Sequence, residues 1–88
     1  MTNDERPISW MTLEKGTSVV ASDGTTVGEV GEVVADRQKD IFSGITLSGG
    51  IFGQDRFVPA ELIDTMTTAK VHLLVDPKQA EQLEAYEG

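Results

Sequence analysis

An Asp-Gly pair between two runs of β-branched residues is the feature of this sequence that most restricts its fold. Asp23 and Gly24 separate residues 17–21 from residues 26–34. Asp and Gly tolerate the positive φ angles of a tight type I′ turn, so such a pair is a strong signal for a β-hairpin. We therefore expect two antiparallel strands joined by a turn in which Gly24 has a positive φ.

The second of these runs has an unusual spacing of valines. Val27, Val30 and Val33 recur every three residues, which would fit a helix, but Gly28 and Gly31 lie between them. Interior glycines and β-branched residues disfavour a helix, and β-branched residues favour a strand. A bulged or strongly bent strand fits both observations, because glycines mark bulges and places where another backbone comes close. Such bending is typical of a small sheet that curls into a barrel.

A second hairpin is predicted further along the chain. Residues 41–48 and residues 51–58 are strand-like and flank Gly49 and the glycine after it. Pro59 closes the second of these strands, because proline cannot donate to a sheet ladder. Residues 59–63 can form one helical turn at the end of the barrel.

The C-terminal part predicts one strand and one helix. Residues 70–75 alternate between apolar and polar side chains, as a half-buried strand does. Asp76 is a good N-cap residue, Pro77 suits the first helical position, and a glutamine follows the cap by three residues. We therefore expect a helix from Pro77 to about Tyr86.

These elements make one all-β domain with a short C-terminal helix. The expected boundaries are a flexible lead-in over residues 1–7, the barrel-like domain over residues 8–76, and the helix and tail over residues 77–88. Trp10 and Leu13 are expected to cover one end of the core. The chain has no cysteine, so its stability must come from packing and hydrogen bonds rather than from disulfides.

A longer pattern surrounds the first hairpin. It runs V-V-A-S-D-G-T-T-V-G-E-V over residues 19–30 and continues through residues 33–36. This pattern resembles the opening hairpin of PRC-barrel domains, V-x-x-x-D-G-x-x-V-G-x-V. The later segments that follow in the order of that family are residues 44–47, residues 56–59, Ile63 and residues 71–73. The resemblance covers roughly Leu13 to Val75.

The resemblance implies a small, strongly bent β barrel that serves as a docking or assembly module, with no shared catalytic residues. The family is named after the cytoplasmic domain of the photosynthetic reaction-centre H subunit. It also includes the C-terminal domain of a bacterial ribosome maturation factor. The two expected functions are therefore a protein-interaction module, which self-associates as a homodimer or docks on a larger complex, and an accessory factor of ribosome assembly or RNA processing that acts through a ribosomal protein.

The charge and hydropathy of the chain restrict the classes of partner that it is expected to bind. The chain has 15 acidic residues against seven Lys and Arg, which gives a net charge of -8. Such a surface repels polyanions, so we expect no direct binding of nucleic acid. No apolar run approaches the length of a membrane span, so we expect no membrane insertion. The expected location is the cytoplasm.

No motif predicts catalysis, a cofactor or a metal site. His72 is the only histidine, and no serine lies in a G-x-S-x-G elbow. The glycines at 49, 50 and 53 lack the Lys-Ser/Thr pair of a phosphate loop. Residues 36–40 lack the alternating acids of a calcium loop. A ligand-binding barrel is disfavoured, because a barrel this small is filled by its own side chains.

Ile51 and Phe52 are the contact residues that the sequence suggests. They lie between glycines in the middle of the second hairpin, where a mobile tip could lift them toward solvent. Exposed apolar pairs often mark protein contacts. The alternative is that the strand begins at Ile51 and that both side chains are buried in the core. The sequence leaves this choice open.

Overall fold

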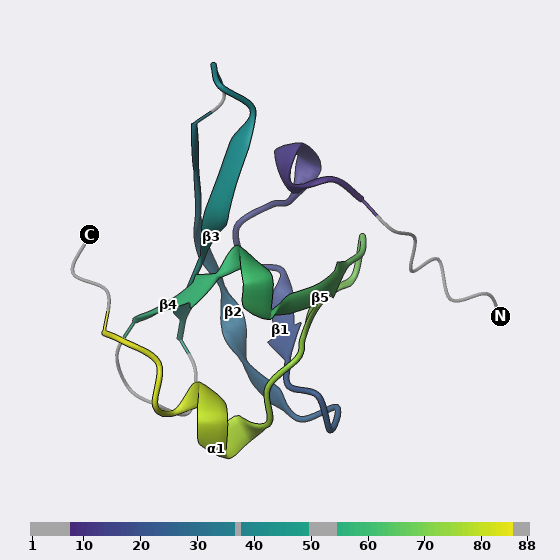
Figure 1. The fold of residues 1–88 in the computed structure, drawn as a ribbon. Helices are drawn as coiled ribbons and strands as arrows, with labels where there is room; N and C mark the ends of the chain where they lie inside the picture. Colours follow the sequence, from purple (N-terminus) through teal and green to yellow (C-terminus); the bar gives the residue numbers. More distant parts are fainter. Residues whose placement is uncertain (1–7, 37, 50–54, 86–88) are drawn as a thin grey trace, which may run out of the picture.

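Six strands form one sheet in the computed structural model, which describes residues 8–36, 38–49 and 55–85 (Figure 1). The strands are β1 (Ser18–Val20), β2 (Thr26–Asp36), β3 (Ile41–Ser48), β4 (Arg56–Pro59), β5 (Ile63–Met66) and β6 (Lys70–Leu73). The helical turns are η1 (Trp10–Thr12), η2 (Ala60–Leu62) and α1 (Pro77–Ala80). The order across the sheet is β4-β3-β2-β1-β6-β5. All neighbours pair antiparallel except β1 and β6, which are parallel.

The sheet must curl because one short connection joins its two edges. β4 and β5 lie at opposite edges, yet only η2 separates them in the chain. In a flat sheet the edges would be about 24 Å apart, at about 4.8 Å per strand spacing, whereas four residue steps reach at most about 14 Å. The amide of Leu74 also donates to the carbonyl of Leu62 at 2.8 Å, which ties η2 to the segment after β6. The sheet does not close, but it has the bend that was predicted for a small barrel.

Two bulges in β2 explain the spacing of its valines. The register of β2 slips against β1 beside Val27, and it slips against β3 between Val30 and Val33. Each bulge inserts one extra residue, so the two-residue repeat of a strand becomes three residues locally. Val27 and Val30 are therefore both buried, and Val33 packs against the same core. The predicted bulged strand is confirmed.

The core is one cluster inside the bend. β5 contributes only the partly buried Ile63 and Met66, whereas every other strand supplies at least one fully buried side chain. The cluster consists of Leu13, Val19, Ala21, Val27, Val30, Ile45, Leu47, Val58, Val71 and Leu73. Leu13, which was expected to cover one end of the core, is a member of this cluster.

The turn of the first hairpin differs from the predicted type. Gly24 has the expected positive φ, 91°, but Asp23 keeps a negative φ, so the turn is not type I′. The Gly24 amide donates to the Ala21 carbonyl at 2.9 Å, and the Ala21 amide donates to the Thr25 carbonyl at 2.8 Å. This is a three-residue loop that ends on a left-handed glycine. The Asp23 carboxylate accepts the Thr25 amide at 2.9 Å, which holds the aspartate in this loop.

The C-terminal helix begins where predicted but is shorter. The capping box is present: the Asp76 carboxylate accepts the Gln79 amide at 2.7 Å, and the Gln79 side chain accepts the Asp76 amide at 3.0 Å. Among the described residues the helix ends at Ala80, and residues 81–85 are not helical. The predicted end at Tyr86 lies outside the described residues.

The segment after α1 covers the outer edge of β4 instead of continuing the helix. The Phe57 amide donates to the Glu84 carbonyl at 2.9 Å, and Arg56 forms an antiparallel bridge with Ala85. The Arg56 Nη1 also donates to the Leu83 carbonyl at 2.6 Å, and the Leu83 side chain packs against the core. A regular helix through these residues would lose the hydrogen bonds to the edge of β4 and the packing of Leu83 on the core.

Candidate docking surfaces

The β2–β3 hairpin extends beyond the rest of the sheet as a two-stranded arm (Figure 1). β1 pairs with β2 only as far as Glu29, and β4 pairs with β3 only from Gly44. Residues 35–36 and 38–43, here named the arm, therefore lie outside the pairing of β1 and β4. A lone two-stranded ribbon is marginally stable in water. The arm therefore needs a contact from outside the sheet.

Residues of η1 provide this contact. The rings of Trp10 and Phe42 stack with their centroids 5.7 Å apart and their planes within 6°. The Ser9 hydroxyl oxygen accepts the Met11 amide at 3.2 Å and so caps the start of η1. Aromatic pairs in offset-stacked arrangements contribute about 0.5–1.5 kcal/mol beyond the area that they bury. Trp10 thus packs on the arm, rather than only covering the end of the core as predicted.

A third bulge explains why Phe42 faces this side of the arm. The register between β2 and β3 slips at Ser43, so the alternation of β3 shifts by one residue. Phe42 consequently packs on the same core as Ile45 and Leu47, although an uninterrupted strand would place it on the opposite face.

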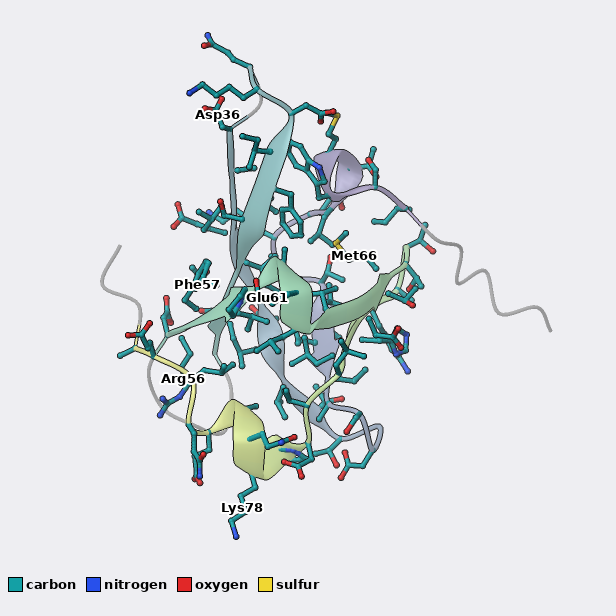
Figure 2. The ribbon with its side chains drawn as sticks, in the orientation of Figure 1. Asp36, Arg56, Phe57, Glu61, Met66 and Lys78 are labelled. Atoms are coloured by element: carbon teal, nitrogen blue, oxygen red, sulfur yellow. The ribbon has the colours of Figure 1, made fainter. Side chains whose placement is uncertain are left out.

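Three large apolar side chains are exposed in the part of the chain that the structure describes. Among the described residues, the exposed large hydrophobic side chains are Met11 (45% exposed), Ile41 (51%) and Leu74 (55%). Met11 follows Trp10 in η1. Ile41 precedes Phe42 in β3, so its side chain points to the face of the arm opposite that of Phe42. Figure 2 shows Asp36, the partner of Ile41 across the ladder, near the outer end of the arm. Nothing in the sequence analysis pointed to Met11 or Ile41.

A groove of about 670 Å³ lies on the sheet where β2 bulges. Its charged lining residues are Glu29, Glu32, Asp55 and Lys15. The buried hydroxyl of Thr46 on its floor accepts the Glu32 amide at 2.8 Å, so this hydroxyl satisfies a backbone donor that the bulge leaves without a strand partner. The groove therefore carries more negative than positive charge, and its hydroxyl has a structural task.

His72, the only histidine of the chain, lies on an inner strand of the sheet. His72 lies in β6, where it pairs with Val20 of β1 and Thr65 of β5. Across residues 8–36, 38–49 and 55–85, no group of three or more His, Cys, Asp or Glu side chains is placed to hold a metal ion. In the same part of the chain no helix is long and apolar enough to span a bilayer.

The structural residues singled out from the sequence lie in separate places. Asp23 and Gly24 form the first turn, Gly28 pairs with Val19 of β1, and Pro59 ends β4 opposite Gly44. They do not form a common site. The proposed contact residues Ile51 and Phe52 lie outside the described residues.

The carboxyl group of Asp23 in the first turn has a pKa below its ordinary value. The Thr25 amide, and secondarily the Thr25 hydroxyl, donate to the Asp23 carboxylate and lower the pKa of Asp23 from its ordinary value. The side chain is fully exposed. The shift therefore reports the turn geometry and not a buried reactive group.

A comparison with known protein families identifies the family to which this fold belongs. The family model of the PRC-barrel domain matches residues 15–82, which is most of the chain. No curated protein matches the sequence. The match includes the first hairpin, the bulged β2, the β4–η2–β5 corner and the start of the segment that covers β4. The chain belongs to the PRC-barrel domain family.

Proposed function

We propose that this chain is a non-enzymatic protein-interaction module that docks on a larger assembly or on a second copy of itself. Family membership supports this proposal, since PRC-barrel domains are small domains often involved in protein interactions. The observation that carries it is the arm, which lies outside the pairing of β1 and β4 and exposes the large apolar side chain of Ile41. Exposed apolar surface often marks a contact with another protein.

The experiment is affinity capture of the full-length chain from its native cells. A photo-reactive cross-linker is introduced on the purified, tagged protein, and cross-linked peptides are identified by mass spectrometry. We expect the same protein or assembly in every replicate, at higher recovery than with an unrelated acidic protein of similar size. Recovery no higher than that control would contradict the proposal.

The identity of the captured material separates the two expected roles. Cross-links to ribosomal proteins, together with co-sedimentation with ribosomal subunits, would support a role in ribosome assembly instead of a general docking role.

We propose the cytoplasm as the location of the protein in the cell. Cell fractionation, followed by blotting for the tagged chain, tests this assignment.

The self-association version has a separate test at Ile51 and Phe52. If these residues form a contact, replacing both with Ser should leave the circular dichroism spectrum and Tm nearly unchanged and should abolish self-association in light scattering. If they are core residues, the double variant should unfold, because losing two large core side chains costs several kcal/mol against a total stability of about 5–15 kcal/mol. A wild-type protein that stays monomeric at high concentration would rule out the homodimer hypothesis.

A further inference from the structure

Residues 8–13 connect one edge of the sheet with the core. The Ile8 amide donates to the carbonyl of Met66, the last residue of β5, at 2.9 Å, and Leu13 belongs to the core cluster. Between these two points of attachment lies η1, which contains no buried residue. We name residues 8–13 the strap, because both of its ends are attached to the rest of the molecule and its middle lies at the surface.

The strap provides a contact that strand pairing does not. Figure 1 shows η1, the purple turn, beside the arm, where Trp10 stacks on Phe42 at a centroid distance of 5.7 Å. β3 and β5 are not neighbours in the sheet, whose strand order is β4-β3-β2-β1-β6-β5. Through Ile8 at one end and Trp10 in the middle, the strap therefore joins the edge strand β5 to the arm part of β3.

Both rings of this stack belong to elements that have little stability of their own. The arm is a two-stranded ribbon beyond the pairing of β1 and β4, and such a ribbon is marginally stable in water. η1 is a 3-10 turn of three residues, which is too short to be stable in isolation. Phe42 also packs against the core cluster, so Trp10 reaches the arm at the point where the arm leaves the core. Segments of this kind open at a lower free energy than the core strands do.

We propose that the strap is a conformational device that fixes the direction of the arm. The Trp10–Phe42 stack opens by local unfolding of η1 while the sheet stays folded, and the arm is then free to bend relative to the sheet. When the stack closes, the arm is held in the direction that Figure 1 shows. The strap needs no partner for this role, so its test is independent of the proposed docking function.

The first test uses the full-length wild-type protein. Trp10 is the only tryptophan of the chain, so the tryptophan emission reports on the strap alone. In a urea titration we expect the change in Trp10 emission to have a lower midpoint than the loss of the far-UV circular dichroism signal, which reports on the sheet. Two probes that do not coincide indicate that one part of the molecule opens first. Coincident midpoints would overturn the proposal, because the strap would then open only when the whole domain unfolds.

The second test is hydrogen exchange in the full-length, ¹⁵N-labelled protein and its variants. In Trp10→Ala the slowest amides of the arm should exchange about tenfold faster than in the wild type, because the stack is lost. The amides of residues 45–47, which lie between β2 and β4, should keep their protection. Trp10→Phe keeps a ring that can stack and should restore most of the protection of the arm. The matched control is Met11→Ala, since Met11 lies in the same turn but is 45% exposed, and it should exchange like the wild type.

Three results of the exchange experiment would overturn the proposal. Unchanged exchange of the arm in Trp10→Ala would show that the arm is held without the strap. Equal acceleration in the arm and at residues 45–47 would show that Trp10 stabilises the whole domain instead of the arm. Acceleration by Met11→Ala as large as that by Trp10→Ala would assign the effect to the turn and not to the stack. If Trp10→Ala does not fold, the urea titration of the wild type still decides whether the strap opens first.

Discussion

Two glycines with positive φ have different reasons to be glycine. Gly24 (φ 91°) lies in the first turn, and a Cβ added there meets no atom within 4 Å. Gly44 (φ 153°) lies where β3 pairs with β4, and a Cβ added there overlaps the carbonyl oxygen of Val58 and comes within 3.1 Å of the Phe57 ring. Only backbone strain opposes a side chain at Gly24, whereas a backbone clash is added at Gly44.

The same substitution at both positions separates these two costs. Gly24→Ala should lower the free energy of unfolding by about 1–2 kcal/mol, the cost of a left-handed residue with a Cβ. Gly44→Ala should cost more, because β4 must move away from β3. Urea unfolding followed by circular dichroism measures both values. Equal losses would show that the contact with Val58 is unimportant.

Thr46 has a structural role that its sequence position does not reveal. Its hydroxyl is buried and accepts the Glu32 amide at the bulge, 2.8 Å away. Thr46→Val keeps the shape but removes this acceptor, so the free energy of unfolding should fall by about 1–3 kcal/mol, the cost of a buried unsatisfied donor. The control is Thr26→Val at an exposed position of β2, which should change stability by less than about 0.5 kcal/mol. Similar urea midpoints for the two variants would contradict this role.

At the scale of elements, local signals in the sequence predict structure well. The Asp-Gly turn, the bulged valine strand and the capping box at Asp76 all depend on residues close in the chain, and all three are present. The turn type was wrong because Asp23 is held by the Thr25 amide and keeps a negative φ. Residue preferences alone do not separate two turns that both end on glycine.

Elements that depend on distant partners were not predicted. β5 is short and contains an acidic residue, so only its pairing with β6 identifies it as a strand. The parallel pairing of β1 with β6 joins the two ends of the domain and leaves no local pattern. The helix was predicted too long because the edge of β4 competes for residues 81–85. The Trp10–Phe42 stack was not predicted because the two rings meet only in the folded chain.

The segment after α1 gives a prediction at this scale. Leu83→Ala removes the apolar anchor that holds this segment against the core, so the Glu84 carbonyl should leave the Phe57 amide more often. Hydrogen exchange should therefore become faster at the Phe57 amide. The amide of Val58, which pairs with Ile45 of β3, should keep its protection from hydrogen exchange. The exposed Leu74→Ala is the control. Equal acceleration at both amides would indicate global destabilisation instead of local release.

For the whole molecule, the cover of one sheet edge restricts how it associates. Residues 84–85 cover β4, and the Ile8 amide donates to the carbonyl of Met66, the last residue of β5, at 2.9 Å. Pro59 removes a further donor from β4. Covered edges disfavour strand-to-strand pairing with other chains. Contacts through side chains remain a better route to a partner than strand pairing at the edge of β4.

The same molecule should not bind nucleic acid directly. Acidic residues outnumber basic ones, 15 to seven, and the groove on the sheet is lined by Glu29, Glu32 and Asp55 against Lys15. Binding to DNA or RNA gains most of its free energy when protein cations displace counterions from phosphates. A surface with this charge balance gains little from that exchange. We expect no measurable affinity at physiological salt for short labelled DNA or RNA oligomers, single-stranded or duplex, in fluorescence anisotropy.

The control replaces Glu29, Glu32 and Asp55 together with Lys. This change reverses the balance of charge in the groove without touching the buried Thr46 on its floor. If charge is what prevents binding, the triple variant should bind the oligomers detectably, and added salt should weaken that binding steeply. The wild type should show no change in anisotropy in the same titration. Micromolar binding by the wild type that falls with salt would mean that a local basic surface outweighs the net charge, and the charge argument would then be wrong.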